Sequence, residues 1–286
     1  MPSAEPSHPL SSIKALTFDL FGTTFDWRAS VQEELVLRAH RKLSSDAASE
    51  VLKRRLRTVT ERDWGRFAQE WRNSYLEFVR GFGAADADAD GGEAGPDAGT
   101  AKWKTVDEHH GESLVRLLDA WHLGDLYSDA EIHSLSLVWH RLRPWADVVD
   151  GLARIRAGGI TLAALTNGNR DLVKDLVDFG GLDFDGLFCA DTFRVYKPHP
   201  GTYLGAARAM GLEPGQVAMV ACHMGDLVGA RACGLRTIYV ERRGEEAMDE
   251  EGDEFCEARR WVDLWIGKHE EGFAALADRL LRLVPS

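Results

Sequence analysis

Polar side chains of several chemical kinds follow the strands that the sequence predicts. They are a carboxylate with a hydroxyl, a hydroxyl with an amide, an ammonium, and an imidazole with a second carboxylate: Asp19 with Thr23, Thr166 with Asn167, Lys197, and His223 with Asp226. In open parallel sheets, ligands bind at the carboxyl ends of the strands. One aspartate after a strand is usually a turn or capping residue, but four such groups after separate strands predict one polar site able to do chemistry.

The elements that must position these residues alternate between strand and helix. Residues 13–20 are a short apolar run that contains Asp19 near its end, which predicts a buried strand. After residue 144 the pattern predicts strands at 160–165, 187–190, 217–221 and 237–240, and helices at 148–157, 171–179, 202–210, 227–233 and 273–283. Repeated strand–helix units indicate a parallel sheet that is covered on both faces.

Between about residues 27 and 143 the apolar residues instead recur at helix spacing. We therefore expect an α/β protein with a Rossmann-like core of residues 10–26 and 144–286, and an inserted α-helical cap of residues 27–143. Inside the cap, residues 84–100 are a low-complexity Ala/Asp/Gly segment, which predicts a mobile loop. The acidic stretch 242–257 is also expected to be a loop.

The composition excludes some classes of partner. The chain has 286 residues and a formal net charge of −12, which argues against nucleic acid and anionic membranes but leaves a small anionic substrate open. Its four cysteines show no metal-binding spacing and are expected to be reduced thiols. With no apolar run of membrane-spanning length and no signal-peptide pattern, we expect a cytoplasmic protein.

Four motifs resemble those of the haloacid dehalogenase superfamily, and they occur in the same order. They are FDLFGT at 18–23, LTNG at 165–168, YKP at 196–198 and GDLVGAR at 225–231. The resemblance covers nearly the whole chain and implies the same core-and-cap fold. It is less specific for the reaction, because most members of that superfamily are phosphatases.

Two positions differ from the phosphatases of the superfamily. Those enzymes carry a general-acid aspartate two residues after the nucleophile, where this chain has Phe21, and a metal-binding carboxylate at the position of Ala221. A phosphate ester needs a proton on its leaving oxygen, whereas a halide leaves without one. Because Mg²⁺ requires oxygen ligands, both differences favour a dehalogenase with no metal and no cofactor.

The opening FDLFGTTFDWR is similar to that of the type II L-2-haloacid and haloacetate dehalogenases. That family carries its halide-binding arginine in a cap segment similar to the one around Arg72, and Lys197 followed by Tyr203 has the family's lysine–tyrosine spacing. The resemblance implies a small halogenated carboxylate as substrate and, from the family alone, a homodimer.

The resemblance also implies a role for each site residue. Asp19 attacks the halogen-bearing carbon and forms an ester, which water then hydrolyses to a 2-hydroxy acid. Thr23 and Lys197 hold Asp19 ionised, and Asp226 positions Lys197 or the hydrolytic water. The remaining residues bind substrate or halide: Arg72 and Asn167 the departing halide, Thr166 the substrate carboxylate, and Phe21, Tyr203 and His223 the rest of the pocket.

Two departures from the best-known L-2-haloacid dehalogenases leave the hydrolytic step open. This chain has Ala221 and His223 where those enzymes have Ser and Asn. His223 can replace the Asn as a donor or act as a base near neutral pH, and haloacetate and 2-halopropionate are equally compatible substrates. Two alternative functions also stay open, a phosphatase acting on a small phosphate ester and a non-catalytic binding protein with the same fold.

Overall fold

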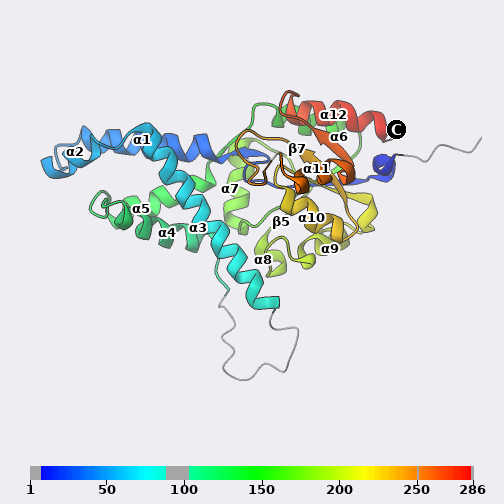
Figure 1. Ribbon diagram of the computed structural model, residues 1–286, viewed down its shortest axis with the longest axis horizontal. Helices are drawn as coiled ribbons and strands as arrows, with labels where there is room; N and C mark the ends of the chain where they lie inside the picture. Colours follow the sequence, from blue (N-terminus) through cyan, green and yellow to red (C-terminus); the bar gives the residue numbers. More distant parts are fainter. Residues whose placement is uncertain (1–7, 88–102, 250, 285–286) are drawn as a thin grey trace, which may run out of the picture. The chain divides into compact units, whose positions relative to one another are not determined.

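The computed structural model describes residues 8–87, 103–249 and 251–284 (Figure 1). The chain divides into two compact units. The first comprises Met1–Phe25, Pro144–Arg170 and Gly180–Ser286, and the second comprises Asp26–Arg143 and Asp171–Phe179.

The first unit is built on a six-stranded sheet in which every neighbouring pair of strands is parallel. The strand order is β5-β4-β1-β6-β7-β8. The strands are β1 (Ala15–Phe18), β4 (Thr161–Leu165), β5 (Gly186–Phe188), β6 (Val217–Ala221), β7 (Arg236–Val240) and β8 (Leu264–Ile266). The predicted α/β class and parallel sheet are confirmed. Strand β8 was not predicted.

The register of the central strands decides where the polar residues emerge. Phe18, the last residue of β1, pairs with Ala164 of β4 and with Val220 of β6. The three strands therefore end at the same level, and Asp19 emerges there beside the segments that follow β4 and β6.

Helices of the first unit alternate with these strands, as the sequence predicts. They are α6 (Val148–Ala157), α7 (Arg170–Gly180, most of which belongs to the second unit), α8 (Ala190–Phe193), α9 (Pro200–Ala209), α10 (Met224–Ala232), α11 (Asp253–Trp261) and α12 (Gly272–Leu283), with 3-10 turns at Pro9–Ser12 and Pro214–Gln216. Helices α6 and α12 lie side by side (Figure 1). A Cβ at Gly151 of α6 would lie 2.5 Å from the carbonyl carbon of Phe273, so this close packing requires a glycine.

Part of the acidic stretch 242–257 is helical, contrary to the expected loop. Helix α11 begins at Asp253, after Gly252 as its N-cap, and Asp253 and Glu254 lie in its first turn. Carboxylates stabilise the amino end of a helix, so the acidic residues that indicated a loop favour a helix start at this position.

The second unit is helical. It contains α1 (Trp27–Leu43), α2 (Glu50–Leu56), α3 (Glu61–Ala87), α4 (Val106–Ala120), α5 (Asp129–Ser136) and a 3-10 turn at Leu137–His140, while the short strands β2 (Phe25–Asp26) and β3 (Arg143–Pro144) pair with each other. Fully buried indole rings of Trp27, Trp71 and Trp139 lie in its core. Of the loop expected at 84–100, residues 84–87 continue α3 and the rest lies outside the described residues. Among the helices of the described ranges, none is long and apolar enough to cross a membrane.

Candidate active site

Asp19 is a buried carboxylate with a donor on each oxygen. It follows β1, its side chain is 8% exposed, and its backbone N–H donates to the carbonyl of Val220 at 3.0 Å. Thr23 Oγ1 donates to Oδ2 at 2.9 Å, and Lys197 Nζ donates to Oδ1 at 2.8 Å. The chain reverses at Gly22, whose φ of +90° is readily adopted by glycine. This turn brings the Thr23 hydroxyl back to the carboxylate.

Lys197 joins two carboxylates. Its Nζ also donates to Asp226 Oδ2 at 2.6 Å, and its side chain is 3% exposed. Burial lowers the pKa of Lys197, but Asp19 and Asp226 more than offset this and raise it above its ordinary value. Burial likewise raises the pKa of Asp19, but Lys197 and His223 hold it well below its ordinary range. The site therefore presents an ionised carboxylate beside a fixed ammonium.

The segment after β4 holds the Lys197 backbone in place. Asn167 Oδ1 accepts from the Lys197 N–H at 2.7 Å, and Asn167 Nδ2 donates to the Lys197 carbonyl at 3.4 Å. An amide nitrogen carries two N–H groups, so one of them can be donated to another acceptor. Thr166 is buried beside it, and its Oγ1 accepts from the N–H of Gly168 at 3.3 Å.

The Thr23 hydroxyl also connects β1 to the loop after β6. Its Oγ1 accepts from the N–H of Cys222 at 2.9 Å while it donates to Asp19. The hydroxyl hydrogen is consequently committed to Asp19, and the loop that carries Cys222 and His223 is held beside the carboxylate.

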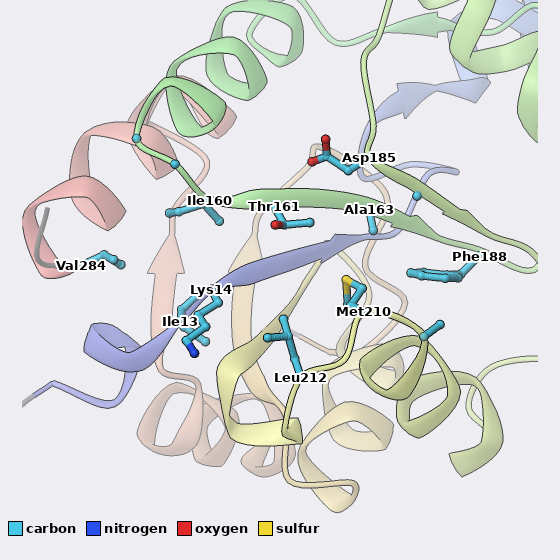
Figure 2. Close-up of a pocket in the computed structure, with 14 residues that line it drawn as sticks. Ile13, Lys14, Ile160, Thr161, Ala163, Asp185, Phe188, Met210, Leu212 and Val284 are labelled. Carbon is cyan, nitrogen blue, oxygen red and sulfur yellow. The ribbon is translucent and has the colours of Figure 1, made fainter.

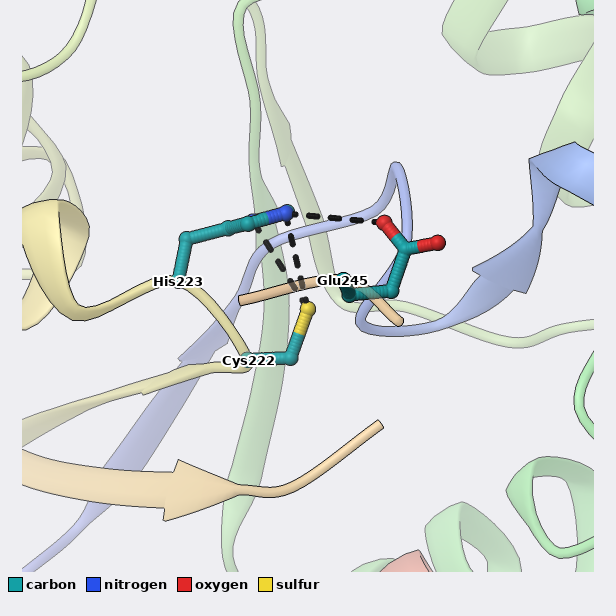
Figure 3. A group of neighbouring side chains, drawn as sticks. All are labelled: Cys222, His223 and Glu245. Atoms are coloured by element: carbon teal, nitrogen blue, oxygen red, sulfur yellow. Dashed lines mark hydrogen bonds and ion pairs between the residues drawn. The ribbon is translucent and has the colours of Figure 1, made fainter. Parts of the chain in front are cut away.

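His223 lies between Asp19 and a second carboxylate. Its Nδ1 is 3.3 Å from Asp19 Oδ2, and its Nε2 is 3.6 Å from Glu245 Oε2. Figure 3 shows the ring with Glu245 at one edge and the Cys222 sulfur, 3.7 Å from both ring nitrogens, on another side. Burial lowers the pKa of His223, whereas Cys222, Asp19 and Glu245 raise it, and the net pKa is well above its ordinary value.

Two residues near this centre were missed by the sequence analysis. Glu245 lies in the acidic stretch after β7, where many carboxylates look alike and no period distinguishes one from the others. Arg242, in the same segment, is 8% exposed and its Nε donates to the carbonyl of Thr23 at 3.0 Å. A basic residue two positions after the buried strand β7 was the one available signal for Arg242.

Phe21 and Tyr203 are both buried in the first unit. Phe21 is 3% exposed and forms an isolated backbone bridge with Phe25. The Tyr203 ring on α9 is fully buried, and a Cβ at Gly229 would lie 2.8 Å from its hydroxyl, so α9 and α10 pack closely there. Burial and the nearby Asp226 raise the pKa of Tyr203 well above its ordinary value. Substrate contacts by these two residues stay predictions.

Arg72 lies in the second unit, on α3. It is 7% exposed, and its guanidinium carbon is 4.5 Å from the ring centre of Tyr75 and 5.7 Å from that of Trp27. The aromatic faces stabilise a buried cation. The arginine is therefore not an ordinary solvated surface residue, and its halide-binding role stays a prediction.

The residues around Asp19 do not fit the Mg²⁺ site of the superfamily's phosphatases. Asp19, His223 and Asp226 carry possible ligand atoms within 4.8 Å of one another. However, Lys197 donates to both carboxylates, so a cation there must compete with a buried ammonium. Ala221 offers a methyl group where an oxygen ligand is needed.

A cavity of about 790 Å³ lies elsewhere in the first unit, at the amino ends of the strands (Figure 2). Ile13 and Lys14 line it just before β1, and Thr161 lines it at the start of β4. Asp19 emerges at the other end of β1, so this cavity and the polar cluster belong to opposite edges of the sheet.

The parallel sheet described above has the architecture of a known superfamily of hydrolases. The chain matches the family model of haloacid dehalogenase-like hydrolases over residues 13–234, and it belongs to that family. It is 35% identical to an (S)-2-haloacid dehalogenase of Pseudomonas sp. (strain YL) over 160 residues, which are 53% of this chain and 68% of the relative.

Solved structures agree with this assignment. The crystal structure of an L-2-haloacid dehalogenase matches with a TM-score of 0.71 and 31% identity, covering 94% of this chain and 99% of that one. The crystal structure of a defluorinating L-2-haloacid dehalogenase matches with a TM-score of 0.71 and 28% identity, covering 96% and 98%.

Proposed function

We propose that this protein hydrolyses a short 2-haloalkanoic acid to the 2-hydroxy acid and halide, with Asp19 as the covalent nucleophile. The observation that carries the proposal is the ionised, buried Asp19 carboxylate held between Lys197 and Thr23. Relatives named for 2-haloacid dehalogenation support the substrate class.

In the first step, an Asp19 oxygen attacks the carbon that bears the halogen. The C–O bond forms as the C–X bond breaks, and the halide takes the bonding electrons. No proton is needed for this departure, which suits a site with Phe21 two residues after Asp19. Lys197 keeps the nucleophile ionised across the neutral pH range because its own pKa is raised.

The other site residues are proposed to bind the substrate. We assign Arg72 and one N–H of Asn167 to the departing halide, where fixed positive charge lowers the barrier, and Thr166 to the substrate carboxylate. Phe21 and Tyr203 are proposed to limit the size of the pocket. Asp226 fixes Lys197 through the 2.6 Å hydrogen bond described above.

We also propose that the protein is cytoplasmic and forms a homodimer. All four cysteines are free thiols, which suits the reducing cytoplasm. A second copy of the chain is the proposed partner, as the family resemblance implies.

Halide release from chloroacetate and from each enantiomer of 2-chloropropionate tests this function. The assay is run with excess EDTA, for the wild type and for Asp19→Asn. We expect release that survives the chelator and disappears in the variant. Magnesium-dependent cleavage of a phosphate ester, with no halide release from any haloacid, would replace this function by the phosphatase alternative.

Arg72 is tested in the same assay by Arg72→Met, with the exposed Arg80→Met on the same helix as the matched control. We expect halide release to fall by about 100-fold in the first variant only, a barrier change of about 3 kcal/mol. Equal activity of the two variants would remove Arg72 from the site.

A further inference from the structure

The segment between β7 and α11 brings one acidic side chain to the imidazole beside the nucleophile. Glu245 Oε2 lies 3.6 Å from His223 Nε2, and the Glu245 side chain is 3% exposed (Figure 3). The other ring nitrogen, Nδ1, lies 3.3 Å from Asp19 Oδ2. The imidazole thus has one nitrogen at the reacting carboxylate and the other at a buried carboxylate.

Two anchors hold Glu245 in this position. On one side of it, Arg242 donates to the Thr23 carbonyl at 3.0 Å and to both oxygens of Asp147 at 2.8 Å. On the other, Glu246 accepts from the backbone N–H of Met224, the residue after His223, at 2.7 Å. Hydrogen bonds therefore fix the acidic segment both to the turn that follows Asp19 (residues 19–24, the nucleophile loop) and to the start of α10.

Gly22 leaves the space that Glu245 and His223 occupy. A Cβ built at Gly22 would collide with Glu245 Oε2 and lie 3.1 Å from His223 Cε1. The turn after Asp19, the imidazole and the acid are packed so closely that a side chain at this turn would displace the acid.

We propose that His223 is the general base for hydrolysis of the Asp19 ester and that Glu245 is the positioning residue that orients its ring and stabilises its charged form. This inference rests on the proposed function and concerns its second step. An imidazole held between a reacting group and an orienting carboxylate is a recurrent arrangement for proton transfer.

In the proposed hydrolysis, water attacks Cγ of the Asp19 ester while one of its protons passes to Nδ1 of His223. The bond from Cγ to the alkyl oxygen breaks, and the alkoxide takes that proton to give the 2-hydroxy acid. The carboxylic acid left on Asp19 then gives its remaining proton to His223. His223 releases one proton to solvent in each cycle, when the next ester forms.

The charge of Asp19 determines the step at which His223 can act as a base. In the free enzyme, burial lowers the pKa of His223, but Cys222, Asp19 and Glu245 more than offset this and favour the protonated ring. Esterification removes the charge of Asp19, so the pKa of His223 falls and the ring can accept a proton. The other ionisable groups near the ring are Cys222, whose thiol pKa is raised by burial, and the ion pair of Lys197 with Asp226.

Rapid-quench kinetics with (S)-2-chloropropionate separates the two steps, because chloride leaves in the first and lactate in the second. For Glu245→Gln we expect a burst of one chloride per site at close to the wild-type rate, followed by lactate release slowed about 10- to 100-fold. Intact-protein mass spectrometry should then show the accumulated ester. Glu251→Gln, an exposed change in the same acidic segment, is the matched control and should behave as the wild type.

A pH profile distinguishes orientation of His223 from a merely structural role. The rate of ester hydrolysis should rise with pH as His223 loses its proton, and Glu245→Gln should move that midpoint to lower pH because a negative charge is lost. Glu245→Asp should restore part of the rate. Unchanged lactate release and midpoint in Glu245→Gln, with active wild type, would overturn this inference alone. No chloride from the wild type with chloroacetate or with either enantiomer of 2-chloropropionate would overturn the proposed function itself.

Discussion

At the scale of single residues, Asp19 is buried and has a hydrogen-bond donor on each carboxylate oxygen. These two properties together determine whether the carboxylate is ionised. A buried carboxylate without partners would take up a proton. Here Thr23 and Lys197 each donate to one oxygen, and His223 stands 3.3 Å from Oδ2. The charge needed for nucleophilic attack is consequently kept inside the protein.

Replacing Thr23 tests the hydroxyl that connects Asp19 to Cys222. We expect Thr23→Val to slow chloride release about 10- to 100-fold, because Asp19 Oδ2 loses a donor and the Cys222 N–H loses its acceptor. Thr23→Ser, which keeps the hydroxyl, should stay within a few-fold of the wild type. Wild-type chloride release in Thr23→Val would contradict this role of the hydroxyl, and a loss in Thr23→Ser alone would show that the methyl group matters instead.

The pKa shifts predict a broad pH plateau for the first step. Asp19 has a depressed pKa and loses its charge only as the pH falls through that low value, whereas Lys197 has a raised pKa and loses its charge only as the pH rises through that high value. Both charges persist between these limits. Single-turnover chloride release by His223→Asn, which lacks the titrating imidazole 3.3 Å from Asp19, should therefore be flat between about pH 5 and pH 9. A drop inside this range that tracks one ionisation would contradict the assignment.

At the scale of elements, the segment after β7 acts as a support for the site. Arg242 is buried and bonded to Asp147 at the start of α6 as well as to the Thr23 carbonyl. Asp147 in turn accepts from the N–H of Phe273 in α12 at 2.6 Å. The ends of two helices and the nucleophile loop thus share one ion pair.

Breaking this ion pair should affect both stability and the second chemical step. We expect Arg242→Met to lower the free energy of unfolding by about 2–4 kcal/mol, because it leaves Asp147 poorly paired, and to slow lactate release more than chloride release. The exposed neighbour Arg243→Met is the control and should change neither. Denaturant unfolding and rapid-quench assays measure the two effects, and wild-type stability in Arg242→Met would refute the supporting role.

At the scale of the whole molecule, stability should depend on pH through His140 of the second unit. Its ring nitrogens lie 3.0 Å from Asp107 and 2.8 Å from Asp175. Burial lowers the pKa of His140, but the two aspartates more than offset this and raise it. When folding raises the pKa of a group, that group stabilises the folded protein. The stabilisation is complete when the pH is below the pKa of the group in the unfolded chain, and it disappears as the pH rises through the pKa in the folded protein.

We therefore expect His140→Gln to lower the free energy of unfolding by about 1 kcal/mol below about pH 6. This difference should shrink as the pH rises past the raised pKa of His140 in the folded protein. His133→Gln, at an exposed position, is the control. Unfolding curves at several pH values measure the difference, and a cost that grows with pH would have the wrong sign for this account.

The sequence predicted the sheet and most of its helices because buried parallel strands and amphipathic helices leave periodic patterns. It also predicted that Asp19, Lys197 and Asp226 belong to one site, since all follow strands of the same sheet. Glu245 and Arg242 could not be predicted in the same way, because a loop has no period and its contacts depend on folding against distant segments. The halide-binding role of Arg72 came from family resemblance together with its spacing from the aromatic residues of the cap.

A single turnover in water labelled with ¹⁸O shows whether a covalent ester forms on Asp19. With enzyme in excess over (S)-2-chloropropionate, we expect lactate without the label and one ¹⁸O in the peptide that contains Asp19, because water attacks Cγ and the product oxygen comes from the carboxylate. Label in the lactate after a single turnover, with none in that peptide, would mean that water displaces the halide directly and would contradict the account.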